Sequence, residues 1–197
     1  MKVVLASQNR HKLEEIQNIL AQFDMELVLQ SELGVHVDVE ETGTSFEENS
    51  AIKARAVMEA TGLPAIADDS GLCVDALGGA PGVCSARYGA PDCVSDQDRL
   101  EFLLNQLRTI RSEERTARFV CVITLVYPNG KTVTARGSCE GLITQEPRGT
   151  GGFGYDPVFF VPSHGCTFAQ MGQQQKNAIS HRAKALNRLC QMLEEIE

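Results

Sequence analysis

Two acidic pairs are the residues of this chain best suited to chemistry. Glu40-Glu41 precedes Thr42-Gly43, and Asp68-Asp69 precedes Ser70-Gly71. Mg²⁺ takes a few carboxylate oxygens together with water and substrate phosphate oxygens. A carboxylate crowded by other carboxylates also gains the basicity that proton abstraction from water requires. The pairs therefore predict a magnesium site with one carboxylate as general base, although acidic pairs that cap solvated turns have the same composition.

A glycine-rich stretch with two aromatic residues predicts a nucleotide-binding loop. It reads Gly149-Thr150-Gly151-Gly152-Phe153-Gly154-Tyr155-Asp156-Pro157. Glycines let a backbone approach a ligand closely, because they carry no Cβ and adopt positive φ angles. The flat rings of Phe153 and Tyr155 could stack on a base. Such a loop suits a nucleotide.

Cationic side chains occur where a polyphosphate could use them. Lys53, Lys176 and Arg182 are candidates to neutralise phosphoryl oxygens, although most surface lysines are only solvated. His181 and Arg182 could instead donate hydrogen bonds to a keto oxygen of a base. A further loop joins a predicted strand to a helix N-terminus, where amides and the helix dipole attract phosphate, although an ordinary capped loop has the same pattern. It consists of Ser7, Gln8, Asn9, Arg10, His11 and Lys12.

Alternating strand and helix patterns position these residues. Strands are predicted over residues 2–6, 25–29, 64–67, 119–127, 131–139 and 158–161. Helices are predicted to begin after Asn9, after Ser45 in a capping box with Glu48, after Ser95, and near His181. The strand over 64–67 predicts that Asp68 and Asp69 lie at a sheet end, where α/β proteins bind ligands. Pro128-Asn129-Gly130 predicts a hairpin, so we expect an α/β fold whose mixed sheet is flanked by helices.

Composition excludes several classes of protein. The 197 residues are 43% hydrophobic and carry a net charge of −8, which disfavours broad binding to nucleic acid. Seven cysteines without a C-x-x-C pair and four scattered histidines predict neither a disulfide framework nor a zinc site. The apolar start is too short for a signal peptide, and no segment reaches the ~20 apolar residues of a membrane span. We therefore expect a cytoplasmic protein of one domain, residues 1–197.

Six ordered motifs resemble those of the inosine triphosphate pyrophosphatase family, and of its bacterial non-canonical purine NTP pyrophosphatases in particular. The motifs cover nearly the whole chain. They are S-x-N-x-x-K at 7–12, E-E-T-G-x-S-F-x-E-N-x-x-x-K-A at 40–54, A-D-D-S-G-L at 67–72, G-A-P-G-x-x-S-A-R-Y at 79–88, G-T-G-G-F-G-Y-D-P at 149–157 and K-x-A-I-S-H-R at 176–182.

The resemblance implies a homodimeric enzyme with an elongated mixed sheet and an active cleft between two lobes. It implies Mg²⁺-dependent hydrolysis of ITP, dITP and XTP to the monophosphate and pyrophosphate, which removes deaminated purines from the nucleotide pool. Glu40 and Asp69 would bind the metal, with Glu41 as an alternative to Glu40, and Asp69 would be the base. The residues implied to bind substrate are those of the 7–12 loop together with Ser70, Phe153, Gly154, Tyr155, Asp156, Lys176, His181 and Arg182.

Two other functions fit parts of the same pattern. A Maf-like pyrophosphatase would act on other modified nucleotides or on canonical ones. A non-catalytic nucleotide sensor would keep Phe153, Lys176 and Arg182 but would have no use for Asp69. A substrate panel distinguishes the first alternative, and replacement of Asp69 distinguishes the second.

Overall fold

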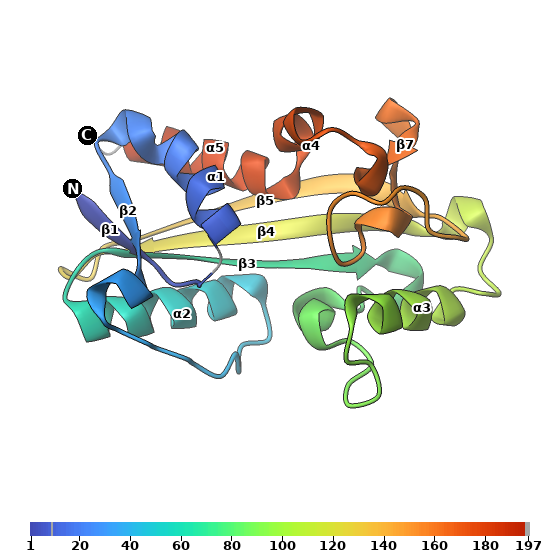
Figure 1. Ribbon diagram of the computed structural model, residues 1–197, viewed down its shortest axis with the longest axis horizontal. Helices are drawn as coiled ribbons and strands as arrows, with labels where there is room; N and C mark the ends of the chain where they lie inside the picture. Colours follow the sequence, from blue (N-terminus) through green and yellow to red (C-terminus); the bar gives the residue numbers. More distant parts are fainter. Residues whose placement is uncertain (9, 196–197) are drawn as a thin grey trace. The chain divides into compact units, whose positions relative to one another are not determined.

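The computed structural model describes residues 1–8 and 10–195, except for the side chains of Arg10, His11, Glu14, Glu15, Asn18 and Gln22. In this part of the chain, seven strands form one sheet in the order β2-β1-β3-β4-β5-β6-β7 (Figure 1). The strands are β1 Lys2–Leu5, β2 Glu26–Leu29, β3 Ala65–Val74, β4 Thr116–Val126, β5 Thr132–Ile143, β6 Phe159–Val161 and β7 Cys166–Thr167. The α-helices are α1 Arg10–Leu20, α2 Phe46–Thr61, α3 Asp96–Gln106, α4 Gln173–Ile179 and α5 His181–Glu194.

The sheet is mixed, which confirms the predicted α/β class. β1 pairs in parallel with β2 and β3, whereas β6 pairs antiparallel with β5 and β7. The chain divides into two compact units. Unit 1 comprises Met1–Asp69, Cys121–Gly137 and Lys184–Glu197, and unit 2 comprises Ser70–Val120 and Ser138–Ala183. The implied cleft between two lobes stays a prediction.

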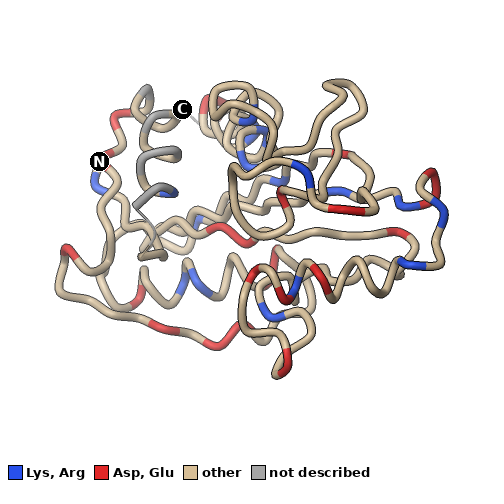
Figure 2. Tube along the Cα trace, turned by 45° about the vertical axis from the view of Figure 1, so that its right-hand side comes forward, with Lys and Arg blue, Asp and Glu red and all other residues tan. Residues whose placement is uncertain are grey.

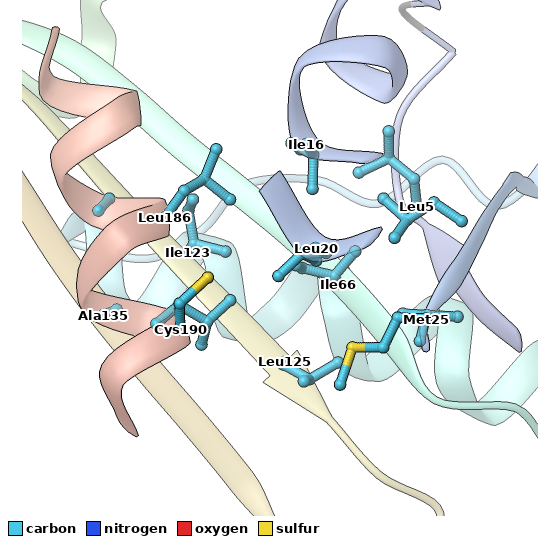
Figure 3. Close-up of a cluster of buried hydrophobic side chains, with 14 of the residues drawn as sticks. Leu5, Ile16, Leu20, Met25, Ile66, Ile123, Leu125, Ala135, Leu186 and Cys190 are labelled. Carbon is cyan, nitrogen blue, oxygen red and sulfur yellow. The ribbon is translucent and has the colours of Figure 1, made fainter. Parts of the chain in front are cut away.

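Unit 1 is built on strands whose alternate residues face different helices. Val3 and Leu5 of β1 belong to a core shared with α1 and α5, whereas Val4 packs with Val57 of α2. Successive side chains of a strand point to opposite faces of the sheet, so this alternation places α2 on the face away from α1 and α5 (Figure 1). Figure 3 shows the core on the α1 and α5 side, where Leu186 lies beside Ile123 of β4.

Unit 2 has a separate, more aromatic core. The side chains of α3 pack there with β3, β4 and the segment around β6. Its buried members include Phe119, Tyr155, Phe159 and Phe168, whose rings lie within the same cluster as Leu103 of α3. This core places the glycine-rich stretch beside large, rigid side chains.

Most predicted elements are confirmed within a few residues. Ser45 caps α2 by accepting the backbone N–H of Glu48 at 3.2 Å, and Ser95 forms a full capping box with Asp98. The capping box predicted at Ser45 is only half formed, because the Glu48 carboxylate accepts the N–H and hydroxyl of Thr44 instead. β7 and α4 are short elements that no sequence pattern predicted.

The prediction that Asp68 and Asp69 lie at a strand end is wrong. β3 continues through both residues to Val74, so the acids lie in the middle of a ten-residue strand. The apolar run ends at Ala67, but backbone pairing does not. A strand tolerates two buried carboxylates at this point because cationic side chains meet them, as described below.

Arg115 is a buried cation that joins segments of unit 2 through backbone carbonyls, with no acidic partner among the described residues. Only 4% of the residue is exposed. Its Nη2 donates to the carbonyl of Leu107 at 2.8 Å, its Nε to Ile110 at 3.0 Å and its Nη1 to Thr144 at 3.1 Å. Leu107 and Ile110 lie just beyond the end of α3, and the Leu107 carbonyl also accepts the backbone N–H of Ile110 at 2.9 Å. The guanidinium group therefore ties the end of α3 to the chain after β5.

Replacing Arg115 by Met should lower the free energy of unfolding by about 2 kcal/mol, because buried carbonyl groups lose charged donors. Urea denaturation would measure the loss. Arg111→Met is the matched control: that side chain is 69% exposed, and its loss should cost less than about 0.5 kcal/mol. Equal midpoints for the two variants would contradict the assigned role of Arg115.

Charge is unevenly distributed along the chain. Residues 13–52 hold ten Asp and Glu and no Lys or Arg, whereas both signs are interspersed along the rest of the trace (Figure 2). The part of the chain described by the structure holds no helix with the length and apolar character needed to span a membrane.

Candidate functional site

The two acids of the Asp68-Asp69 pair point to opposite faces of β3. Ile66 packs on the α1 side of the sheet, and Ala67 packs with α2 on the other side. Strand alternation therefore directs Asp68 toward α1 and Asp69 toward α2. Lys12 of α1 accordingly pairs with Asp68, with its Nζ 2.8 and 3.0 Å from the two carboxylate oxygens. The pair is thus split into two separate ion-pair sites.

Asp69 shares one lysine with Glu41. The Nζ of Lys53, on α2, lies 2.7 Å from Oε1 of Glu41 and 3.2 Å from Oδ1 of Asp69. The Asp69 side chain is 9% exposed and the Lys53 side chain 19%. A single ammonium group therefore holds two carboxylates together in a partly dry environment, where electrostatic interactions are stronger than in water.

Lys53, Asp69 and Glu41 form a charged triad. For the pKa of Lys53 and for that of Asp69, burial acts in one direction and the charge of the ion-pair partner in the other. Burial raises the pKa of Asp69 above the ordinary aspartate value, and the positive charge of Lys53 only partly offsets that rise. Burial by itself would lower the pKa of Lys53, but the negative charges of Asp69 and Glu41 outweigh it and raise that pKa. Asp69 is thus a carboxylate of increased basicity beside a lysine that stays protonated, as a general base requires.

The carboxylate oxygens of Asp69 and Glu41 fit a hard divalent cation whose other coordination positions would be filled by water and by substrate phosphate. Oδ2 of Asp69 is buried and has no hydrogen-bond partner within the described residues, so one lone-pair site of the carboxylate remains for a ligand. The side chains that the structure describes include no cluster of three or more His, Cys, Asp or Glu arranged as a metal cage. Mg²⁺ needs no such cage, since it keeps waters and is commonly bound by one or two carboxylates plus phosphates.

Glu41, rather than Glu40, has its carboxylate at the triad. Glu40 is exposed, and its carbonyl accepts the backbone N–H of Thr42 at 3.0 Å. Glu41 is half buried and reaches Lys53. The predicted role of Glu40 as a metal ligand stays a prediction, and the geometry favours the alternative left open from the sequence.

A pocket in unit 1 adjoins the triad. Its wall includes an irregular segment that the buried side chain of Gln30 holds in place, because Gln30 both donates to the Val37 carbonyl and accepts the Val37 N–H. The pocket also includes two residues of the predicted phosphate loop. Its lining residues are Ala6, Ser7, Gln8, Gln30, His36, Val37, Asp38, Val39, Glu41, Lys53 and Val57.

The structure places the 7–12 loop only in part. Ser7 and Gln8 line the pocket beside Lys53. Asn9 lies outside the described residues, and Arg10 and His11 begin α1 with side chains that are likewise not described. The strand, loop and helix order around them agrees with prediction.

Asn49 fastens the segment that carries Glu41. It lies on the buried face of α2, fully inaccessible to solvent, and its Oδ1 accepts the backbone N–H of Gly43 at 2.8 Å. A Cβ added at Gly43 would come within 2.5 Å of that same Oδ1 and 2.7 Å of the Glu48 Cβ. Gly43 is therefore required for close approach of the segment to α2.

Gly43→Ala should lower kcat/KM for the hydrolysis that the sequence resemblance implies roughly tenfold, because the new methyl group must push the Glu41 segment away from α2 and displace the Glu41 carboxylate from Lys53. Steady-state pyrophosphate release would measure the effect. Gly172→Ala is the control: its φ is −67°, and nothing lies within 4 Å of an added Cβ. Equal activity of the two variants would refute the packing argument.

Most glycines of the 149–157 stretch lie so close to other residues of the protein that a Cβ would clash with them. A Cβ at Gly149 would lie 2.7 Å from the backbone of Ala169, and one at Gly152 would lie 2.0 Å from Oδ2 of Asp156. Gly154 differs, because its φ is +57° and the space beside it is open. Close packing within the protein therefore accounts for Gly149 and Gly152, and the approach of a ligand to this stretch stays a prediction.

Phe153 is presented to solvent by a network beneath it. The residue is 67% exposed, and its N–H donates to Oδ2 of Asp156 at 3.0 Å. The same oxygen pairs with Nζ of Lys176 at 2.6 Å. That ammonium group lies 5.1 Å from the centre of the Phe153 ring and 5.4 Å from that of Phe168. Lys176 and Asp156 therefore support an exposed aromatic surface, and Phe153 is well suited to stack on a base.

Tyr155 does not provide the second stacking surface expected from the sequence. It is 6% exposed, and its hydroxyl donates to the Ser85 carbonyl at 2.9 Å. Burial raises the pKa of this hydroxyl, which stays protonated. Tyr155 instead anchors the end of the glycine-rich stretch in the unit 2 core.

The other predicted site residues lie in unit 2. Ser70 is half buried in β3, directly after Asp69. His181 and Arg182 begin α5, as predicted, and are 8% and 9% exposed. Cationic or hydrogen-bonding side chains held this firmly can read the edge of a base, since their donors have fixed directions.

Three supporting residues of the site were not predicted from the sequence. Asn49 occupies a position of the apolar stripe of α2, and a polar residue there was a usable signal. Asp96 accepts the N–H of Gly154 at 3.1 Å, and Phe119 stacks on His181; both contacts join distant segments and leave no local sequence signal.

The chain is similar to known proteins in both sequence and structure. A sequence model of the Ham1 family matches residues 3–192. The chain is 51% identical to a dITP/XTP pyrophosphatase of Shigella flexneri over 98% of both chains, and 50% identical to one of Thermus thermophilus over 96% of this chain and 90% of the relative. A solved HAM1 protein from Coxiella burnetii superposes with a TM-score of 0.92 at 47% identity, over 99% of both chains.

Proposed function

Because this chain belongs to the Ham1 family, we propose that it hydrolyses non-canonical purine nucleoside triphosphates to the monophosphate and pyrophosphate. The family match confirms the resemblance drawn from six sequence motifs. Relatives that are half identical over nearly their whole length are dITP/XTP pyrophosphatases, and dITP, ITP and XTP are therefore the proposed substrates.

The observation that carries the proposal is the buried Asp69 carboxylate. It is held at Oδ1 by Lys53, which it shares with Glu41, and its Oδ2 has no hydrogen-bond partner within the geometric limits among the residues that the structure describes. An oxygen buried without a partner costs free energy unless a ligand satisfies it, so this arrangement supports the binding of a metal ion or a substrate at Asp69.

The chain's own residues account for the proton transfer. Asp69 Oδ2 takes a proton from a water molecule as the water oxygen bonds to the α-phosphorus, and the α–β anhydride bond breaks to release pyrophosphate. Lys53 keeps Asp69 oriented and ionised, and its positive charge opposes the negative charge of the phosphates. Ser7 and Gln8, at the N-terminal side of α1, are assigned to the phosphates.

Mg²⁺ is the proposed cofactor, with Asp69 and Glu41 as ligands and Glu40 as the alternative to Glu41. When bound, the ion would neutralise phosphate charge and polarise the anhydride. Both carboxylates would reach it from the same face of the sheet, since Lys53 of α2 contacts each of them.

Base recognition is assigned to unit 2. Phe153 supplies the stacking surface, supported by Lys176 and Asp156. His181 and Arg182 would donate hydrogen bonds to the 6-keto oxygen of hypoxanthine or xanthine. The 6-amino group of adenine would meet those donors with another donor, which disfavours ATP.

A substrate panel tests the proposal. Purified protein is incubated with ITP, dITP, XTP, ATP and dCTP, with Mg²⁺ or with EDTA, and pyrophosphate and orthophosphate are measured separately. We expect pyrophosphate from the first three substrates only in the presence of Mg²⁺. Preferred turnover of pyrimidine or canonical nucleotides would favour the Maf-like function, and binding of ITP without any turnover would favour the sensor.

The cellular setting belongs to the same proposal. Free cysteines suit a cytoplasmic enzyme, and the resemblance implies a homodimer. Analytical ultracentrifugation would test the dimer, and neither a nucleic acid nor a membrane is a proposed partner.

A further inference from the structure

The imidazole ring of His181 lies flat against the ring of Phe119. The ring centroids are 4.9 Å apart, and the ring planes differ by 15°. Phe119, on β4, is itself nearly parallel to Phe168, with an interplanar angle of 12° at 5.7 Å. Both members of the first pair are 8% exposed, so the stack lies within the packed core of unit 2.

This stack determines the direction of the hydrogen bonds that His181 can make. The ring nitrogens of an imidazole bond within the plane of the ring. In isolation that plane rotates easily, because the second side-chain torsion of histidine is broad and roughly two-fold. A parallel aromatic neighbour in a close-packed core restricts the rotation, since tilting the ring would drive it into Phe119.

We propose that Phe119 is a positioning residue that sets the preference of this enzyme for 6-keto over 6-amino purines by fixing the plane of His181. The inference rests on the proposed function, in which His181 reads position 6 of the base. Phe119 itself needs no contact with the substrate. Its contribution lies in keeping a donor aimed at one point, so that a keto oxygen is accepted and an amino group is rejected.

The core of unit 2 offers a matched control for the loss of this ring. Phe159 belongs to the same hydrophobic cluster and is fully buried. Its ring centroid lies 4.6 Å from that of Phe119, but the two ring planes differ by 56°. Phe159→Leu removes the same ring area from the same core as Phe119→Leu. It leaves the parallel neighbour of His181 in place.

The experiment measures kcat/KM for ITP and for ATP in the wild type, Phe119→Leu, Phe119→Tyr and Phe159→Leu. We expect the ITP/ATP ratio to fall roughly tenfold in Phe119→Leu, mainly through a higher KM for ITP. Phe119→Tyr keeps a flat ring and should keep the wild-type ratio. Phe159→Leu should change both substrates alike and leave the ratio unaltered.

Two results would overturn the inference: an unchanged ratio in Phe119→Leu, or an equal fall in Phe159→Leu. If the leucine variants do not fold, Phe119→Met and Phe159→Met replace them, because methionine fills a similar volume without a flat ring. The proposed function is judged separately by the wild type. Release of pyrophosphate from ITP with an unchanged variant ratio rejects only the role of Phe119, whereas an inactive wild type rejects both.

Discussion

Asp69→Asn is expected to lower kcat for ITP by about 10³-fold, while the protein remains folded and still binds the nucleotide. The amide is nearly isosteric with the carboxylate, but its nitrogen carries hydrogens and its oxygen is a very weak base. It therefore removes the group that takes the proton from water. It also removes one negative ligand from the proposed metal site. Pyrophosphate release under saturating ITP and Mg²⁺ measures the loss.

Two further measurements make this prediction specific. Asp92→Asn carries the same chemical change at an exposed position and should retain wild-type kcat. Calorimetric titration of Asp69→Asn with ITP should still show binding through the stacking surface at Phe153. If Asp69→Asn kept its turnover, the general base would have to be sought elsewhere. If the wild type bound ITP without turnover, the sensor function would be favoured.

Lys53→Met should lower kcat about 10²-fold and shift the acid limb of the pH profile to higher pH. Lys53 is the cation shared by Glu41 and Asp69, so its removal leaves two carboxylates facing each other without a counter-charge. Burial already raises the pKa of Asp69, and the positive charge of Lys53 opposes that rise. Removing the charge must therefore raise the Asp69 pKa further.

The sign of the pH effect follows from which form is active. The base works as the carboxylate, so activity is lost as the pH falls through the Asp69 pKa. In the wild type this loss should occur above the ordinary range for aspartate, and in Lys53→Met at a still higher pH. The profile of kcat/KM, which reports the free enzyme, measures both. Lys131→Met, at an exposed site in the β-hairpin, should match the wild type; an unmoved acid limb in Lys53→Met would contradict the electrostatic role of Lys53.

The sequence by itself determined the family, the class of fold and the chemical types present at the site. Motifs, strand periodicity and helix caps such as Ser45 and Ser95 are local patterns, because each depends on residues a few positions apart. Asp69 and Lys53 could be selected in this way, as could the exposed ring of Phe153. Their selection required no knowledge of which segments meet.

Only the tertiary structure decided how those residues are paired. The continuation of β3 past Ala67 puts Asp68 and Asp69 on opposite faces, so each meets the lysine of a different helix. Glu41 rather than Glu40 reaches Lys53, and the Tyr155 ring turns into the core instead of toward a ligand. The physical reason is that side-chain burial and ion pairing depend on contacts between segments far apart in the chain, and local sequence patterns carry no record of those contacts.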